Sequence, residues 1–342
     1  MAFEIVATGR ALPENRVTNE ELAKTVDTSD EWIRSHTGIG SRYIAGPELA
    51  NSELATRAAR NAVAMLAEKT GESAEAVIAS IDVIIFATAS GDYLGGIPPS
   101  ACLVQHALGA AGAAAFDIAV CCTGFIYGLD IASGLLAVQE KRRRALLVCS
   151  ELLSRLTDWS DRGTCVLFGD GAAAVIIEKT AAPQSGGGRR GILRCMLGAD
   201  GSGASSLMIR RGGSRNPYKS GEIVDTPPHI EMDGRAVYNF AVKTLTATIT
   251  SLLEAERLRL EDVALVIPHQ ANARIVEAAK KRAGIPDGKV YTNMEEYANT
   301  SAASIPIALD EAHRSGRLKT GDILLCVGFG GGLTYGGALI VW

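Results

Sequence analysis

The sequence predicts an α/β protein built from two similar halves, on the basis of three observations. Of the 342 residues, 47% are hydrophobic but only 5% are aromatic, so helices and strands must pack mainly through Ala, Val, Leu and Ile. Short runs rich in Val and Ile alternate with longer segments of helical period, which is typical of βαβ units. Segments of the second half also repeat the outline of segments in the first. This much hydrophobic sequence is enough for one large domain or two fused ones.

The alternation predicts individual elements. Near-continuous apolar runs predict strands buried on both faces at Ile81–Ala89, Ala145–Cys149 and Ala172–Ile177. Apolar residues at helical spacing predict helices at Glu53–Glu68, Tyr238–Leu253 and Ala273–Ala283. We expect Asn51 or Ser52 to cap the first of these helices, because short polar side chains accept hydrogen bonds from the first turn.

The internal similarity divides the chain near residue 180. Two pairs of segments resemble each other, Ile81–Ile85 with Glu261–Leu265 and Phe168–Ile177 with Gly331–Ile340. The composition changes abruptly at residues 178–188, where Gly and Pro interrupt the pattern. We therefore expect one half at residues 1–180 and the other at 181–342.

Charge and cysteine content argue against several classes of function. With 34 basic and 38 acidic residues, the net charge is −4, unlike that of a nucleic-acid-binding protein. The dense basic run Lys141–Arg144 is interpreted as a solvated helix end. The seven cysteines form no CxxC pair, and no export signal or long apolar span is recognised. These features predict a cytoplasmic chain with free thiols and with neither a nucleic-acid nor a membrane partner.

Four short segments place reactive or ligand-binding residues at the ends of predicted strands. The pair Cys121–Cys122 precedes a helical segment, where the helix dipole and free N–H groups favour a nucleophilic thiolate. His269 follows a strand-like run, Asn299 precedes a run of small residues, and Gly328–Thr334 is a glycine-rich loop. Each alone has an ordinary structural interpretation, as a buried thiol, a core histidine, a helix cap or a turn. Together, in this order, they are more specific.

In these four segments, the chain resembles the thiolase-like condensing enzymes, and within them the β-ketoacyl-acyl carrier protein synthase III family. The resemblance covers essentially the whole chain. Its motifs are Val26–Ile33, Thr37–Ile39, Asp161–Thr164, Phe168–Gly171 and Gly330–Thr334. The resemblance implies a five-layered αβαβα fold made of two similar halves and acting as a homodimer.

The resemblance also implies a catalytic trio. Cys122, rather than Cys121, matches the nucleophile because Thr-Gly-Phe follows it directly, and His269 and Asn299 match the other two positions. In the family, the Cys takes an acyl group from acyl-CoA, and backbone N–H groups matching Cys122 and Gly331 form the oxyanion hole. Malonyl-acyl carrier protein then loses CO₂, and His and Asn donate to the enolate oxygen. The implied activity initiates fatty acid synthesis, with acetyl-CoA as the expected primer.

The asparagine separates this branch from its relatives. A thiolase removes an α-proton with a further Cys, and the segment Gly328–Gly332 contains no Cys. A hydroxymethylglutaryl-CoA synthase needs a catalytic Glu, and neither Glu48 nor Glu53 lies in a motif that supports this role. The decarboxylating branch is favoured, with no metal or redox cofactor. Two alternatives stay open: a secondary-metabolism relative that uses another acceptor, and a non-catalytic carrier-binding protein, which would not require the intact trio.

Substrate contacts follow from the same resemblance. Trp32 and Arg155 match residues that sandwich the adenine of CoA, which suits an aromatic face and a guanidinium plane, although Trp32 also suits a surface helix. His36 lies in the same CoA-binding region, and Asn272 matches a contact to the pantetheine arm. A patch for docking the acidic carrier protein is expected from Arg235, Arg274, Lys280 and Lys281. A solvated helix face is the alternative for this patch.

Four features qualify these expectations. His36 replaces a common Arg, so one CoA contact is expected to be weaker. Ala298 replaces a common Gly before Asn299, which is acceptable if its φ is negative. Tyr93–Pro99, which in the family reaches into the partner's acyl pocket, is longer than usual. Gly201–Pro228, rich in Gly, Ser and Arg, is interpreted as a long surface loop or lid.

Overall fold

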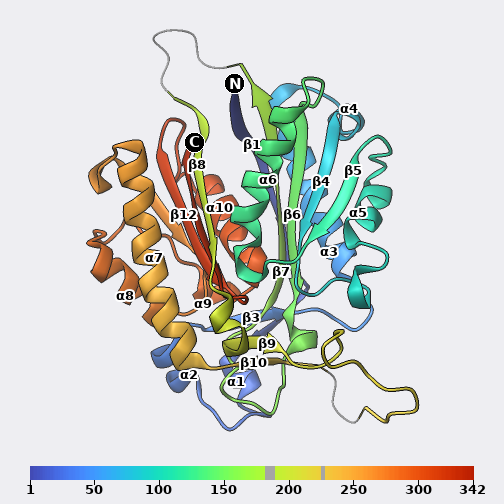
Figure 1. The fold of residues 1–342 in the computed structure, drawn as a ribbon, viewed down its shortest axis with the longest axis vertical. Helices are drawn as coiled ribbons and strands as arrows, with labels where there is room; N and C mark the ends of the chain where they lie inside the picture. The colour runs from blue at the N-terminus through green and yellow to red at the C-terminus, as the bar shows by residue number, and fades with distance from the viewer. Residues whose placement is uncertain (182–188, 225–227) are drawn as a thin grey trace.

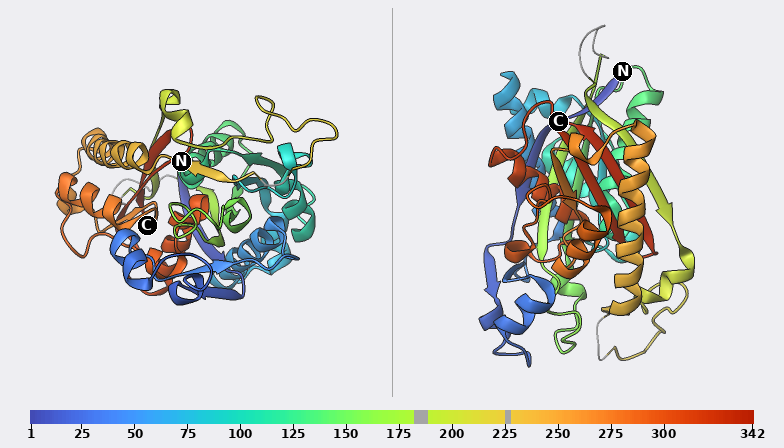
Figure 2. Two further views of the ribbon diagram at one scale, coloured as in Figure 1. Left: turned by 90° about the horizontal axis from the view of Figure 1, so that it is seen from below. Right: turned by 90° about the vertical axis from the view of Figure 1, so that its left-hand side faces the viewer.

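The computed structural model describes residues 1–181, 189–224 and 228–342, and it has the five layers that the resemblance implied (Figure 1). Two central helices, α6 (Gly124–Val138) and α10 (Ser304–Arg314), lie between two sheets. The outer faces of the sheets are covered by α3 (Asn51–Thr70) and α5 (Ser100–Leu108) on one side, and by α7 (Gly234–Glu256) and α8 (Ala273–Ala283) on the other. The view from below separates these two outer layers clearly (Figure 2).

The two sheets have the same strand order. The first sheet runs β1 (Ala2–Ala11), β7 (Asp170–Thr180), β6 (Arg144–Leu152), β4 (Ile81–Ala87), β5 (Ala114–Ile118). The second runs β8 (Gly191–Ala199), β13 (Thr334–Val341), β12 (Ile323–Gly330), β11 (Leu265–Pro268). In both, the first two pairings are antiparallel and the next is parallel. An isolated parallel bridge from Val266 to Val290 occupies the place of the fifth strand. This repeated order accounts for the internal sequence similarity.

Most of the predicted elements are present, with differences at their ends. The predicted strands correspond to β4, β6 and β7, and the predicted helices to α3, α7 and α8. The predicted cap of α3 is wrong: its N-cap is Ala50, whose N–H instead donates to the Glu53 carboxylate at 3.3 Å. The predicted division at residue 180 falls directly after β7, and residues 182–188 lie outside the described part of the chain.

Smaller elements surround the ends of the two sheets. They are β2 (Asn15–Thr18), α1 (Asn19–Leu22), α2 (Asp30–Thr37), β3 (Ser41–Ile44), α4 (Ala74–Ala79) and α9 (Met294–Tyr297). The interpretation of Gly201–Pro228 as a loop is partly wrong, because it begins with η4 (Gly201–Ser206) and β9 (Leu207–Ile209), and β9 pairs with β10 (Ile230–Met232). Residues 225–227 lie outside the described part. The segment Tyr93–Pro99 contains a short turn, η1 (Leu94–Gly96), with exposed apolar side chains.

Helix α6 is apolar apart from a few residues, among them the exposed Asp130, because both sheets pack against it. Phe125, Ile126 and Leu129 are fully buried in the cluster between the sheets. By length and composition alone, Cys121–Val138 is also a candidate membrane span, a test that the core helix of a globular protein passes equally. At its first residue, Gly124, a Cβ atom would lie 2.7 Å from Cβ of Ala87. Only a glycine therefore allows the start of α6 to approach the first sheet this closely.

Two glycines of α6 provide a matched test of this packing. Gly124→Ala is expected to destabilise the protein by about 1–3 kcal/mol, because rigid neighbours leave no room for the methyl group. Gly134→Ala, on the same helix with no atom within 4 Å of its Cβ position, is expected to be neutral or to stabilise by up to about 1 kcal/mol. Urea unfolding of both variants checks the prediction, and equal effects would contradict it.

Candidate active site

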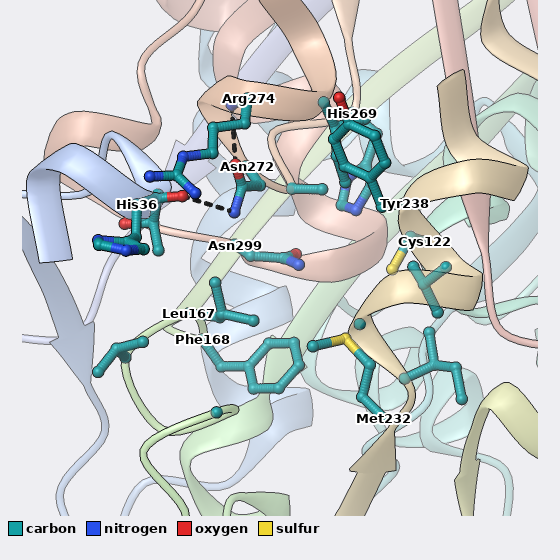
Figure 3. A pocket seen from close by; sticks show the side chains of 18 of the residues that line it. His36, Cys122, Leu167, Phe168, Met232, Tyr238, His269, Asn272, Arg274 and Asn299 are labelled. Carbon is teal, nitrogen blue, oxygen red and sulfur yellow. Dashed lines mark hydrogen bonds between the residues drawn. The ribbon is translucent and has the colours of Figure 1, made fainter. Parts of the chain in front are cut away.

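A cavity of about 540 Å³ brings the predicted catalytic trio together (Figure 3). Cys122 lies in η2 (Cys121–Thr123), immediately before α6, and His269 directly follows β11. Asn299 precedes η6 (Ser301–Ala303), the turn that leads into α10. All three side chains line the cavity although the residues are buried, with exposed fractions of 8%, 1% and 7%. Each half of the fold therefore contributes to one site.

The turn around Cys122 is packed tightly against the glycine-rich loop. A Cβ atom on Gly330 would lie 2.8 Å from the backbone N of Cys122, so this position admits no side chain. The hydroxyls of Thr123 and Thr334 are 2.9 Å apart and fasten the loop to the turn. Of the two predicted oxyanion-hole N–H groups, that of Cys122 lies beside its own thiol, while that of Gly331 is directed at the Cys121 thiol.

The surroundings of Cys122 oppose the thiolate expected from the helix terminus. Burial raises the pKa of the Cys122 thiol far above its ordinary value, and the neighbouring Cys121 and Glu151 raise it further. A hydrogen bond with the Ser301 side chain acts in the opposite direction but is smaller. Removal from water favours the neutral thiol and acts against the effect expected of the helix terminus.

His269 is neutral for the same reason. Burial lowers the pKa of its imidazole to about 3. Its backbone N–H donates to the Val327 carbonyl at 2.8 Å, which ties it to β12, and its ring packs edge-on against Phe329 at 5.4 Å between centroids. Its Nδ1 lies 2.7 Å from Oγ of Ser304. The ring therefore presents its other nitrogen, Nε2, to the cavity.

Asn299 is oriented by hydrogen bonds on both its backbone and its side chain. Its backbone N–H donates to the Leu167 carbonyl at 2.9 Å, and its own carbonyl accepts from Gly169 at 3.1 Å. Its side-chain Oδ1 accepts the Ser301 N–H at 2.9 Å. With the oxygen occupied in this way, the assigned amide orientation leaves the NH₂ group as the donor toward the cavity.

The backbone on either side of Asn299 is strained. Ala298 has φ +56° and ψ −155°, so the condition of a negative φ is not met. Ser301 is also left-handed, with φ +47°. Such conformations cost about 1–3 kcal/mol each for residues other than glycine, and they persist where the surroundings fix them. The sequence showed the Gly-to-Ala difference but not the backbone angle.

Glu151 is a buried acid that the sequence analysis missed. It is the next-to-last residue of β6, beyond the predicted strand Ala145–Cys149, and it is fully buried, which raises the pKa of its carboxyl group. Its carboxylate accepts from the Ala89 N–H at 3.0 Å, the Ser90 hydroxyl at 2.6 Å and the Thr88 hydroxyl at 3.1 Å, and it also bonds to the Ser301 side chain. A charged residue inside a run of buried apolar residues was the signal that could have identified it.

The structure corrects the predicted adenine sandwich. Arg155 donates to the carbonyls of Gly46, Pro47 and Leu49, and it lines a separate depression. The guanidinium that lies over Trp32 belongs to Arg162, whose Cζ is 4.6 Å from the ring centroid. Arg162 lies in the motif Asp161–Thr164, so the sequence did contain the signal, and the choice between two nearby arginines was wrong.

Residues at the cavity mouth are already engaged with one another. His36 stacks on Trp32 at 4.3 Å between ring centroids. Asn272 caps α8 by accepting the Arg274 N–H at 2.8 Å, and it donates to the His36 carbonyl at 3.2 Å. The Arg274 guanidinium donates to the Ser35 carbonyl at 3.0 Å (Figure 3 shows Arg274 beside Asn272).

The four predicted docking cations do not form one uniform patch. Arg235 and Arg274 line the cavity, whereas Lys281 is exposed on α8 farther along. Lys280 forms ion pairs with Glu277 and, at 2.8 Å, with Asp287, which raise its pKa and neutralise its charge locally. Arg235 and Arg274 are therefore the cations placed at the site.

The site combines a buried thiol at the start of a helix with a neutral imidazole and a carboxamide, and it lies in a five-layered fold of two similar halves. This combination defines a thiolase-like condensing enzyme. Family models for 3-oxoacyl-[acyl-carrier-protein] synthase III and for its C-terminal part match residues 116–201 and 253–342. The chain belongs to the 3-oxoacyl-[acyl-carrier-protein] synthase III family.

Individual relatives agree with this assignment over the whole chain. The β-ketoacyl-[acyl-carrier-protein] synthase III of Caldanaerobacter subterraneus is 47% identical, covering 100% of this chain and 98% of the relative. The enzyme of the same name from Desulfitobacterium hafniense is 45% identical, covering 99% and 97%. The crystal structure of 3-oxoacyl-[acyl-carrier-protein] synthase III from Aquifex aeolicus aligns with a TM-score of 0.87 and 40% identity, covering 99% and 100%.

The buried neutral His269 predicts an acid-sensitive stability. Its pKa is about 3 in the folded chain and about 6.5 when exposed, so the unfolded chain binds more protons between these values. This contribution is fully present above pH 6.5 and is lost as the pH falls. Between pH 7 and pH 5, the wild type should lose about 2 kcal/mol more unfolding free energy than His269→Asn. Urea unfolding at both pH values measures this difference, and equal losses would contradict the assignment.

Proposed function

We propose that this protein is a β-ketoacyl-acyl carrier protein synthase III, which loads an acyl group from acyl-CoA onto Cys122 and condenses it with malonyl-acyl carrier protein. The product is a β-ketoacyl-acyl carrier protein, with release of CO₂ and CoA, and the reaction initiates fatty acid synthesis. The observation that carries the proposal is the meeting of Cys122, His269 and Asn299 in one cavity. The names and lengths of the relatives support it.

The first step exchanges one thioester for another on Cys122. Sulfur attacks the acyl-CoA carbonyl, the CoA thiolate leaves and takes up a proton, and the acyl group remains bound to the enzyme. The developing oxyanion needs donors, and the N–H of Cys122 lies beside the sulfur to provide one. Gly331 is the second donor in this proposal, once its N–H turns from the Cys121 thiol. The acylated residue carries no charge, which suits a site where burial disfavours thiolate.

The second step creates an enolate without a base. Loss of CO₂ from the malonyl group leaves its electron pair on the α-carbon, so the site needs donors at the enolate oxygen. A neutral His269 and the amide of Asn299 meet this need, and their burial strengthens such hydrogen bonds. The carbanion then attacks the acyl carbonyl on Cys122, and the sulfur leaves as a thiolate that takes up a proton.

The cavity mouth suits the adenine and pantetheine parts of CoA. Trp32 and Arg162 present an aromatic face and a guanidinium plane for the adenine, with His36 beside them. Asn272 lines the path from there to Cys122. The cations Arg235 and Arg274 would face the acidic carrier protein at this opening, with Lys281 farther along α8.

The proposal also covers the oligomeric state, the cellular location, the primer, the cofactor requirement and the pathway. A homodimer is supported by the segment Tyr93–Pro99, where Tyr93, Leu94 and Ile97 are 53%, 77% and 80% exposed. We also propose a cytoplasmic location, acetyl-CoA as the primer, and chemistry that requires no metal or redox cofactor. A second candidate is priming in a polyketide pathway, because a priming β-ketosynthase of such a pathway aligns with a TM-score of 0.86 and 32% identity.

The decisive experiment follows the acyl group by mass spectrometry. The enzyme is mixed with acetyl-, isobutyryl- or longer acyl-CoA, and malonyl-acyl carrier protein is then added. The acyl mass should appear on the Cys122 peptide and be discharged as β-ketoacyl-carrier protein, while Cys122→Ala should not load. Loading without discharge would refute the decarboxylative step and favour an acyltransferase that uses another acceptor.

The two arginines near the mouth make opposite predictions. Arg162→Ala should weaken CoA binding about 3- to 30-fold, because it removes the guanidinium over Trp32. Arg155→Ala should change the Kd less than about twofold, because its side chain lies in another depression. Calorimetric titration with CoA, together with thermal unfolding of both variants as a control, tests the pair. The reverse order would restore the original assignment of Arg155.

A further inference from the structure

We propose that Ser304 is a positioning residue that holds His269 with its single ring proton on Nε2, the nitrogen that faces the cavity. The proposal deepens the proposed function and rests on it, since it explains how His269 becomes a hydrogen-bond donor to the enolate. The Oγ of Ser304 lies 2.7 Å from Nδ1 of His269, and the two residues are 2% and 1% exposed. This bond is therefore shielded from water.

Proton accounting decides the direction of this hydrogen bond. At neutral pH the imidazole carries one proton, so one ring nitrogen donates and the other accepts. The Ser304 oxygen is already approached by the Gln270 N–H at 3.4 Å. Within the described ranges, Nδ1 is the acceptor that the structure offers to the Ser304 hydroxyl proton. If Nδ1 carried the ring proton instead, that hydroxyl would be buried without an acceptor, which is costly.

The same short segment orients the other donor in the same way. Ser301 donates its N–H to Oδ1 of Asn299, and Ser304 donates its hydroxyl to Nδ1 of His269. In both side chains the accepting atom is hydrogen-bonded inside the protein, and the donating group, Nε2–H of His269 or the NH₂ of Asn299, is left for the cavity. Ser304 is also the first residue of α10, which is buried from Ser304 to Asp310. The packing of this helix therefore fixes the position of the Ser304 hydroxyl.

This role separates the two halves of the reaction. Loading of Cys122 depends on backbone N–H donors, whereas decarboxylation depends on the proton at Nε2. Ser304→Ala should therefore slow condensation about 10- to 100-fold, the range seen when the hydrogen-bond partner of a metal-bound histidine is removed. The rate of acyl loading from acyl-CoA should change less than about twofold. Ser304→Thr, which retains the hydroxyl, should recover most of the condensation rate.

The test combines kinetics with NMR detection of the protonation state of the two His269 ring nitrogens. Protein labelled with ¹⁵N-histidine is studied by NMR, and the His269 signals are assigned by their loss in His269→Asn. The wild type should show a protonated Nε2 and an unprotonated Nδ1, and Ser304→Ala should populate the other tautomer. Ser133→Ala, which removes a hydroxyl bonded to the Leu129 carbonyl in α6, is the matched control and should leave the His269 signals unchanged.

Three outcomes would overturn the proposal. They are a protonated Nδ1 in the wild type, an unaltered tautomer in a slow Ser304→Ala variant, and equal slowing of loading and condensation. If malonyl-acyl carrier protein never removes the acyl group from Cys122 of the wild type, the proposed function fails instead. The NMR result still decides the tautomer of His269 independently.

Discussion

The structure depends on one packing constraint: helix α6 must fit between two sheets with its first turn open to a cavity. Gly124 permits this, because a Cβ atom there would lie 2.7 Å from Cβ of Ala87 and 3.0 Å from Cβ of Ala302. Gly330 does the same for the loop that passes over Cys122. The Cys122 thiol is therefore placed by close backbone packing more than by hydrogen bonds. A shift of either backbone would move the nucleophile relative to His269 and Asn299.

Burial then sets the electrostatics of the site. It raises the pKa of Cys122 and Glu151 and lowers that of His269, so each of these groups is pushed toward its neutral form. A thioester exchange followed by loss of CO₂ suits such an environment, because neither the acylated Cys nor the two donors carry a charge. The price of this arrangement is strain, held at Ala298 and Ser301 on either side of Asn299.

Apolar runs predicted the buried strands, because burial on both faces leaves a local pattern. The five layers and the roles of Cys122, His269 and Asn299 came from the family resemblance, which rests on motifs along the whole chain. The wrong and missed assignments depend on where loops turn in space. The motif Asp161–Thr164 could have identified Arg162, and the structure shows directly that its guanidinium, not that of Arg155, lies over Trp32. The role of Ser304 emerges only when α10 begins beside His269. The positive φ of Ala298 is likewise set by its surroundings, because its own side chain opposes it.

The shared strand order also relates the two halves of the site. Element by element, β4, α6, β6 and β7 of the first half correspond to β11, α10, β12 and β13 of the second. The two central helices thus occupy equivalent positions, yet the start of one presents a nucleophile and the start of the other anchors two donors. Each half therefore supplies a different part of one site. Neither half alone encloses the cavity, so catalytic competence arises only when both have folded and met.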